Sequence, residues 1–442
     1  MNKNLIFDVG MHKGEDTDFY LKKGFNVIGF EADPDLIKHC KERFKSEISN
    51  NSLIIVEGAI VNKNFNAKRL IFTTDIDKAI QNSDIIFIAV GTPSGKNGQS
   101  ADLSNVFKVA KTISKNLNKH KIIITKSTVP LGTGDRIEKI LSKHNPSSKF
   151  DVVSNPEFLR EGEALRDFRY PDRVVIGTNN SKKISPILKK LYDPIIKKGA
   201  KFIVVSRKAA ELIKYAANAF LATKITFINE IANLCEETGI NVDDIAEGIG
   251  TDQRIGSRFL RAGPAYGGSC FPKDTKALAK TSDDFKVNLS LVKNVIRSNG
   301  NRNNLIAQKI LKIAKQNHLK KIGFLGVTFK ANTDDMRDSS SLFIMPKLLK
   351  NNLKISYYEP TGSKSVLSKY KKIKYCINQK ELITNCDFVI IHSDWDEFKN
   401  IDFNKVSKNK KLSICDLRNL YHPDEFKNKK IKYYSIGRPF HG

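Results

Sequence analysis

Short apolar runs alternate with longer helical patterns along most of this chain. The runs are rich in β-branched residues, and a first series predicts strands at residues 4–9, 26–30, 53–56, 84–90, 121–125, 151–153 and 173–176. A second series, which begins near residue 320, predicts strands at 322–325, 354–358, 387–392 and 412–415. Strands that alternate with helices are typical of parallel, doubly wound sheets. We therefore predict an α/β fold with two Rossmann-like domains.

A single long helix is predicted between the two series, so that a central helical domain joins the Rossmann-like domains. Its pattern runs from residue 208 to 238 and ends at Gly239, a residue type that commonly closes a helix. The Asn-rich piece 298–304 predicts only a loop or a helix start. The expected domains are 1–200, which resembles a dinucleotide-binding domain, 201–300, which is helical, and 301–442, a second α/β domain.

Composition narrows the class of protein. The chain has 442 residues, of which 40% are hydrophobic and 28% charged, as in ordinary globular proteins. The net charge of +28 would attract polyanions, but the lysines are spread along the whole chain and form no nucleic-acid motif. The six cysteines lack CxxC spacing, and no apolar stretch approaches membrane-spanning length. We expect a cytoplasmic protein without a metal, a nucleic-acid partner or a membrane anchor.

One short segment near the middle of the chain contains the residue types that covalent catalysis requires. Gly267 and Gly268 precede the run Ser269-Cys270-Phe271-Pro272-Lys273-Asp274. A cysteine attacks carbonyl carbon as thiolate, and a nearby cation such as Lys273 favours that form. The glycines let the backbone approach a ligand closely. The alternative is a buried structural cysteine.

Several further motifs accompany this segment in a fixed order. They are Val90-Gly91-Thr92-Pro93, Lys126-Ser127-Thr128-Val129-Pro130, Asn155-Pro156-Glu157-Phe158-Leu159-Arg160-Glu161, Ala210-Glu211-Leu212-Ile213-Lys214 with Asn218, Asp252-Gln253-Arg254-Ile255-Gly256, and Phe329-Lys330 followed by Asp335-Met336-Arg337. From about residue 68 to 442 the chain resembles the UDP-glucose/GDP-mannose dehydrogenase family. The form of the cysteine motif is most similar to the branch that oxidises UDP-glucose.

The resemblance implies an NAD-dependent, four-electron oxidation of UDP-glucose to UDP-glucuronate. Cys270 would hold the sugar aldehyde as a thiohemiacetal and then as a thioester. Lys214 and Asp274 would supply proton transfer and charge stabilisation, aided by Asn218 and a water held through Thr128. Glu157 or Glu161 would assist hydrolysis of the thioester. Each assignment also has a purely structural alternative. Lys214 could be a solvated lysine, Asp274 could cap a helix, and the two glutamates could be acidic residues in the first turn of a helix.

The resemblance also implies binding residues and a partner. For the substrate these are Phe259, Leu260, Gly263, Phe329, Lys330 and, reaching over from a neighbouring subunit of a homodimer, Arg254. A guanidinium suits phosphate because it binds two oxygens at once. For NAD they are Gly10, Glu31, Thr92, Pro93, Thr128 and Arg337. The alternative for Arg254 and Arg337 is that each is an ordinary surface arginine.

The N-terminus departs from the family pattern. A strand leading into GxGxxG is expected for NAD, whereas this chain has Asp8-Val9-Gly10-Met11-His12-Lys13-Gly14, followed by an acid at Glu31. Residues 1–64 resemble the opening of FkbM-type S-adenosylmethionine-dependent methyltransferases. Three interpretations follow: an active dehydrogenase with an altered cofactor loop, a UDP-sugar-binding pseudoenzyme, and a methyltransferase fusion.

Restoring the usual loop tests the first two interpretations. The double variant Asp8→Gly/Lys13→Gly removes the negative charge of Asp8, which would face the pyrophosphate, and completes the GxGxxG motif. NAD is therefore expected to bind at least about tenfold more tightly, which corresponds to about 1.4 kcal/mol. Calorimetric titration of NAD into both proteins measures the change. Unchanged affinity would mean that Asp8 and Lys13 do not limit NAD binding.

Overall fold

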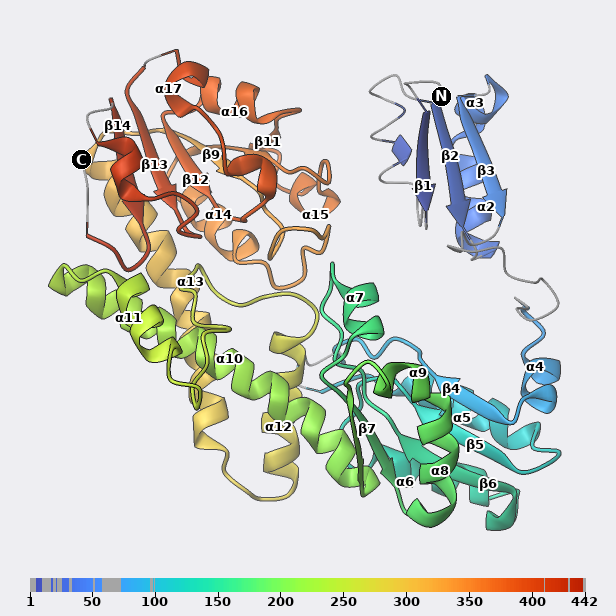
Figure 1. The fold of residues 1–442 in the computed structure, drawn as a ribbon. Coiled ribbons are helices and arrows are strands. Elements are labelled where there is room, and N and C mark those ends of the chain that lie inside the picture. Colours follow the sequence, from blue (N-terminus) through green and yellow to red (C-terminus); the bar gives the residue numbers. More distant parts are fainter. Residues whose placement is uncertain are drawn as a thin grey trace. The chain divides into compact units, whose positions relative to one another are not determined.

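The computed structural model describes residues 5–9, 17–18, 21, 26–31, 34–50, 52–57, 73–95, 98, 100–408, 410–427 and 430–439. The chain divides into two compact units, each with its own packing. One comprises Met1–Thr74 and Glu359–Ser365, and the other comprises Asp75–Tyr358 and Val366–Gly442. Figure 1 labels the helices and strands of both units.

The smaller unit contains a three-stranded parallel sheet with the order β1-β2-β3. Its elements are β1 (Leu5–Val9), β2 (Asn26–Glu31), α2 (Pro34–Arg43), α3 (Lys45–Ser49) and β3 (Leu53–Glu57). The side chains of Val27, Cys40, Phe44 and Leu53 are buried together in its core. The strands agree with the sequence prediction. The Gly10 loop lies outside the described residues.

The larger unit begins with a five-stranded sheet of order β4-β5-β6-β7-β8. Its strands are β4 (Ile85–Ile88), β5 (Lys121–Thr125), β6 (Phe150–Ser154), β7 (Arg173–Thr178) and β8 (Lys201–Val205), and its helices are α4 (Ile76–Asn82), α5 (Ser104–Lys115), α6 (Thr133–Ser142), η1 (Ser147–Lys149), α7 (Ala164–Arg169), α8 (Ser181–Leu191) and α9 (Asp193–Ile196). Two apolar clusters contain alternate residues of β5, for example Ile123 in one and Ile122 and Ile124 in the other. Since alternate residues of a strand point to opposite faces, this sheet is buried on both sides.

One strand pair in this sheet is antiparallel, which the alternation of strands and helices does not predict. Val153 pairs with Thr178 and Ser154 with Gly177, in opposite directions. The connection between β6 and β7 contains only the short helix α7, so the chain turns back instead of making a crossover that would keep β7 parallel to β6.

The central region is helical. It contains α10 (Arg207–Thr238), α11 (Val242–Gly250), α12 (Phe271–Asp284) and α13 (Ser290–Gln316). The Ser206 hydroxyl caps the start of α10 by accepting a hydrogen bond from the Ala209 amide, and Gly239, with φ of 72°, closes it in the left-handed conformation. Both ends agree with the sequence prediction to within one residue.

The prediction of a loop or a helix start at 298–304 is wrong, because these residues lie in the interior of α13. Glycine and asparagine have low helix propensity, but tertiary contacts override it here. The Asn299 amide group pairs with both backbone groups of Tyr266 at 2.9 and 3.0 Å. The buried Arg302 guanidinium donates to the Gly263 carbonyl at 3.0 and 3.1 Å. The polar residues of α13 therefore hold the segment that leads to Cys270.

The C-terminal sheet has six strands in the order β11-β10-β9-β12-β13-β14, all parallel. Its elements are β9 (Lys321–Leu325), α14 (Ser341–Lys350), β10 (Lys354–Tyr358), α15 (Ser365–Ser368), β11 (Ile373–Tyr375), α16 (Gln379–Asn385), β12 (Phe388–Ile391), η2 (Asp396–Phe398), α17 (Phe403–Val406), β13 (Leu412–Asp416), η3 (Pro423–Phe426) and β14 (Ile431–Ser435). The predicted fold class, two Rossmann-like regions joined by a helical one, is confirmed.

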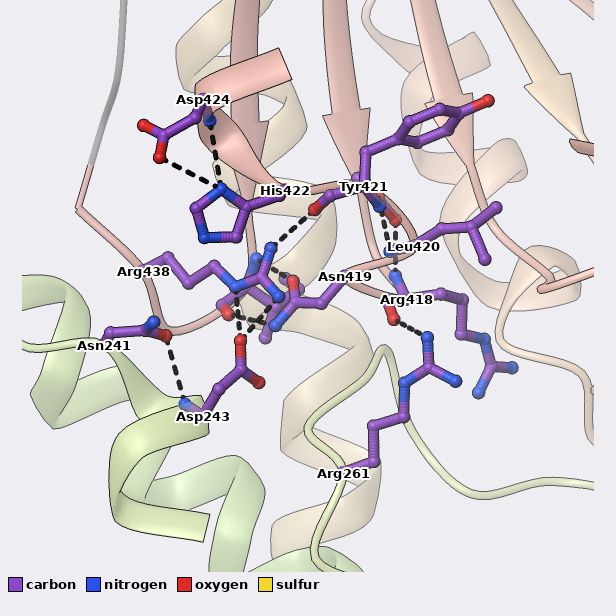
Figure 2. A network of polar contacts seen from close by, with 12 residues as sticks. Asn241, Asp243, Arg261, Arg418, Asn419, Leu420, Tyr421, His422, Asp424 and Arg438 are labelled. Carbon is purple, nitrogen blue, oxygen red and sulfur yellow. Dashed lines mark hydrogen bonds and ion pairs between the residues drawn. The ribbon is translucent and has the colours of Figure 1, made fainter. Parts of the chain in front are cut away.

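A polar network ties the segment after β14 to the helical region (Figure 2). The Arg438 guanidinium donates to Asp243 of α11 at 2.6 Å and to the Tyr421 carbonyl at 2.7 Å. The Asn419 amide pairs with both backbone groups of Ile436 at 2.9 and 3.0 Å. The C-terminal sheet is thereby attached to α11 as well as to the helices that flank it.

The described residues contain neither a membrane-spanning helix nor a cluster of metal ligands. No helix there combines the length and apolar character needed to cross a membrane. In the same part of the chain, no group of three or more His, Cys, Asp or Glu side chains is arranged to hold a metal ion.

A buried carboxylate connects α10 to the first sheet of the larger unit. The Glu211 side chain accepts hydrogen bonds from the Gly132 and Gly134 amides at the start of α6, at 2.6 and 2.8 Å, and from the Ser154 hydroxyl at 3.0 Å. Burial nonetheless raises the pKa of Glu211. A helix N-terminus presents free N–H groups, and Glu211 satisfies two of them.

Removal of this carboxylate is expected to weaken the fold. Glu211→Ala leaves two backbone N–H groups without an acceptor, so the free energy of unfolding should fall by about 2–4 kcal/mol. Urea unfolding followed by circular dichroism measures the loss. Glu237→Ala, the same change at an exposed position of α10, is the matched control and should shift stability little. Equal stability of the two variants would contradict the assignment.

Candidate active site

Cys270 lies at the N-terminus of α12, where it is the N-cap residue. Its side chain is half-buried, and its Sγ is 3.5 Å from the Ser269 hydroxyl. Its carbonyl accepts a hydrogen bond from the Asp274 amide at 2.8 Å, which closes the first turn of the helix. A helix N-terminus favours a thiolate, so the backbone geometry suits a nucleophilic cysteine.

The turn before Cys270 is pressed against the segment that follows β9. A Cβ atom on Gly267 would lie 2.4 Å from the Asp338 carbonyl oxygen. Gly268 has φ of 82°, and its amide donates to the Arg337 carbonyl at 2.8 Å. Both positions require glycine, one for space and the other also for its left-handed backbone.

Asp274 joins the cysteine turn to the long helix. Its carboxylate is 1% exposed and accepts hydrogen bonds from the Asn218 amide at 2.7 Å and the Lys273 ammonium at 2.6 Å. Lys273, considered from sequence as the cation that acts on the thiol, therefore pairs with Asp274. The pKa of Arg337 is raised mainly by its hydrogen bond to Asp335 and to a smaller degree by the charge of Glu161.

Lys214 lies one turn before Asn218 on α10 and contacts the segment after β6. Its Nζ is 3.0 Å from Glu157 Oε1, and its side chain is only 4% exposed. The same carboxylate oxygen accepts a hydrogen bond from the Thr128 hydroxyl at 3.4 Å. The solvated-lysine alternative is therefore wrong for Lys214, and three of the predicted residues form one contact cluster.

Glu161 lies where three segments meet. Its carboxylate accepts hydrogen bonds from the Thr333 hydroxyl and, at 3.5 Å, from the Ser269 hydroxyl, which also contacts Cys270. Its carbonyl accepts a hydrogen bond from Lys330 Nζ at 2.5 Å. Burial raises the pKa of Glu161, with a further rise from the charge of Asp335. A carboxylate with a raised pKa is a stronger proton acceptor.

The described cofactor candidates of the larger unit follow the strands β4, β5 and β9. Thr92 and Pro93 follow β4, and the Thr92 hydroxyl donates to the Thr128 carbonyl at 3.0 Å. Arg337 Nε donates a hydrogen bond to Asp335 at 2.8 Å. The Arg337 side chain is 66% exposed, which leaves other guanidinium N–H groups available to an anion. Glu31 ends β2, but its side chain lies outside the described part of the chain, as Gly10 does.

The substrate candidates separate into three groups. Phe329 and Lys330 follow β9 beside Glu161, and the Phe329 ring packs on Gly268. Phe259, with φ of 67°, stacks edge to face on Phe271 at 6.1 Å, while Leu260 is buried in the core and the Gly263 amide donates to Asn229 at 2.8 Å. Arg254 has an 89% exposed side chain and contacts Asp252, away from the other site residues of its own chain.

Four residues near the site were not selected from sequence. Ser269 and Thr333 contact Glu161, and Lys126 donates to Asn155 Oδ1 at 3.2 Å next to Glu157. The Arg418 guanidinium donates to the carbonyls of Phe329 at 2.6 Å and His392 at 2.9 Å. Ser269 and Lys126 stand inside the quoted motifs, whereas only the fold brings Thr333 and Arg418 to the site.

The fold first identifies the chain as a dehydrogenase of the nucleotide-sugar class. Among solved structures it is similar to a UDP-glucose dehydrogenase from the hyperthermophilic archaeon Pyrobaculum islandicum, with 27% sequence identity, a TM-score of 0.74 and 98% of each chain covered. Three sequence models of one family also match the chain. They are the NAD binding domain at residues 16–196, the central domain at 208–301 and the UDP binding domain at 323–423.

The chain belongs to the UDP-glucose/GDP-mannose dehydrogenase family. It is 44% identical to a UDP-glucose 6-dehydrogenase of Rhizobium meliloti over 383 residues, which are 86% of this chain and 88% of that protein. It is 38% identical to a UDP-glucose 6-dehydrogenase of Rickettsia typhi over 421 residues, which are 94% of both.

The family match extends further toward the N-terminus than the sequence motifs indicated. The NAD binding model begins at residue 16, inside the segment 1–64 that resembled a methyltransferase opening. The predicted start of the family resemblance near residue 68 is therefore wrong, and the methyltransferase resemblance gains no support. The departure from GxGxxG, at residues 8–14, precedes the matched residues.

Proposed function

We propose that the protein catalyses the NAD-dependent four-electron oxidation of UDP-glucose to UDP-glucuronate. The observation that carries the proposal is the packing of the Cys270 turn against α10, where Asp274 bonds to Asn218 one turn from Lys214. The 44% identity with a UDP-glucose 6-dehydrogenase supports UDP-glucose as the nucleotide sugar. NAD, when bound, accepts one hydride in each of the two oxidations.

Each residue of the candidate site would perform one part of this oxidation. Lys214 and Asp274, with Asn218, would take the proton of the sugar C6 hydroxyl and stabilise the developing oxyanion. The Cys270 sulfur would add to the aldehyde to give a thiohemiacetal, which becomes a thioester on the second oxidation. Glu157, which accepts from Thr128, or Glu161, with its raised pKa, would direct water onto the thioester.

The residues around the first sheet fit a dinucleotide. Thr92, Pro93 and Thr128 would bind NAD at the carboxyl ends of β4 and β5. Gly10 and Glu31 stay candidates for the same cofactor on the sequence alone. Arg337 would bind its pyrophosphate, and the exposed part of the guanidinium supports this role. A protein that binds UDP-glucose but not NAD would instead fit the pseudoenzyme interpretation.

UDP-glucose would bind between the helical region and the C-terminal sheet. Phe329 and Lys330 would contact the nucleotide, and the backbone around Phe259, Leu260 and Gly263 would contact the sugar. The exposure of Arg254 supports its action on the site of a second subunit, because among the described residues the only carboxylate that its guanidinium contacts is Asp252. The domains proposed for these roles are 1–200, 201–300 and 301–442, in a cytoplasmic homodimer.

One exposed face of α10 supports the homodimer. Phe220, Phe227 and Leu234 are 65%, 49% and 60% exposed and follow one another at intervals of seven residues. Seven residues are close to two helical turns, so the three side chains form one apolar stripe. Large exposed apolar stripes commonly mark interfaces.

Cys270→Ala tests the proposed chemistry. Without the sulfur no thiohemiacetal forms, so turnover of UDP-glucose should fall by about a thousandfold or more. The unaltered enzyme should form two NADH per UDP-glucose, measured by absorbance with UDP-glucuronate quantified by chromatography. Cys235→Ala, at a buried cysteine of α10, should retain activity. Two NADH per sugar from Cys270→Ala would exclude the covalent route.

Phe227→Glu/Leu234→Glu tests the homodimer. Buried carboxylates oppose association, so the double variant should have the mass of one 49.8 kDa chain, while the unaltered protein has twice that mass. Light scattering after size exclusion measures both. Phe343→Glu, at an exposed phenylalanine of α14, should remain dimeric. Because Arg254 would be supplied by the partner, the monomer should also lose turnover. An unaltered protein that is monomeric and active would contradict both points.

A further inference from the structure

Side-chain contacts continue the pairing of β5 and β6 beyond the ends of the strands. The last backbone pair is Thr125 with Ser154, after which the Asn155 amide donates to the Thr125 carbonyl at 2.9 Å. The next contact joins Lys126 Nζ to Asn155 Oδ1 at 3.2 Å. The one after it joins the Thr128 hydroxyl to Glu157 at 3.4 Å. Each segment advances by two residues from one side-chain contact to the next.

Three groups form hydrogen bonds with the Asn155 side chain, and the Lys126 ammonium is one of them. Its side-chain Nδ2 donates to the Val175 carbonyl of β7 at 2.8 Å, and its Oδ1 also accepts from the Tyr192 hydroxyl at 2.5 Å. The residue is 1% exposed. The Lys126 ammonium supplies the only charged group among these three contacts, and charge-assisted hydrogen bonds are stronger than neutral ones.

Lys126 also acts on the site through its charge. Burial lowers its pKa to about 8; the charge of Glu157 opposes this shift, and the charge of Lys214 on α10 adds to it. The ring of Tyr192, at the C-terminal end of α8, lies 5.8 Å from its Nζ. Protonated Lys126 therefore gives the group Lys126, Lys214 and Glu157 one net positive charge, which suits a site where an oxyanion develops.

We propose that Lys126 is a positioning residue whose ammonium, through Asn155, holds the Glu157 carboxylate where it meets both Thr128 and Lys214. This proposal rests on the proposed function, since it assigns Lys126 a part in the oxidation of UDP-glucose. It predicts that turnover depends on the charge of a group that touches neither substrate nor cofactor.

The test is the pH dependence of kcat and KM for the unaltered enzyme, Lys126→Arg and Lys126→Met. The unaltered enzyme should lose kcat above about pH 8, where Lys126 gives up its proton. Lys126→Arg keeps its charge, so the decline should move to higher pH. Lys126→Met should lack the decline and have a kcat about 10- to 100-fold lower at pH 7, because a displaced carboxylate misdirects the reaction. KM for UDP-glucose should change by less than about threefold.

Lys121→Met is the matched control for these kinetics. Lys121 begins β5, the strand that ends just before Lys126. It is buried and donates to the carbonyls of Gln81 and Ser83 at 3.0 and 2.6 Å, at the opposite end of the strand from the site. Its variant should be less stable but keep kcat and the decline near pH 8. A loss of kcat in Lys121→Met equal to that in Lys126→Met would assign the effect to general destabilisation and overturn the proposal.

Unfolding provides a readout that does not require activity. The folded-state pKa of Lys126, about 8, lies below the ordinary value near 10.4, so from pH 8 to 10 the unfolded chain holds a proton that the folded chain has released. The stability of the unaltered protein relative to Lys126→Met should therefore rise with pH over this interval. A constant difference would contradict the burial of the ammonium.

The other possible results separate a failure of the Lys126 proposal from a failure of the proposed function. Normal kcat in Lys126→Met, or a decline near pH 8 that persists in Lys126→Arg, would contradict the proposal for Lys126 alone. An unaltered protein that never reduces NAD with UDP-glucose would contradict the proposed function, and the proposal for Lys126 would fall with it.

Discussion

Three polar side chains on successive turns of α10 hold the candidate site together. Glu211, Lys214 and Asn218 are spaced by three and four residues, so they leave the helix on one face. Glu211 binds the start of α6, Lys214 binds Glu157 after β6, and Asn218 binds Asp274 beside the cysteine. A rotation of α10 would break all three contacts at once, and the relative position of the two halves of the site therefore depends on this helix.

Two charges at the centre of the site are buried, which makes their pairing essential. Asp274 and Lys214 are 1% and 3% exposed, and each has an opposite charge within 3.0 Å. A buried ion pair adds little net stability, but removal of one partner leaves an uncompensated charge that costs several kcal/mol. Substitutions here will disturb folding as well as chemistry, and conservative variants are needed to separate the two.

Most of the architecture could be predicted from the sequence because local patterns determine it. The apolar runs give the strands, and Gly239 gives the end of α10. The antiparallel β7 and the helical 298–304 could not be predicted, because they depend on a short connection and on contacts with Gly263 and Tyr266 far away in the chain. The site residues within motifs could be selected as a set, but their pairing could not: Lys273 contacts Asp274, and Thr333 reaches Glu161 only after folding.

The loop after β9 connects the C-terminal sheet to the segments that surround the Cys270 sulfur. Near its start, Arg418 holds Phe329 to the C-terminal sheet. Lys330 and Thr333 contact Glu161, and the Arg337 carbonyl accepts a hydrogen bond from the Gly268 amide. Gly162, with φ of 79°, has no room for a Cβ because the Asn332 carbonyl oxygen would lie 2.7 Å away. The loop is thus fixed by close backbone contact on one side and by hydrogen bonds on the other. Because it carries residues proposed for the nucleotide sugar near its start and for the dinucleotide near its end, its placement would bring both ligands to Cys270.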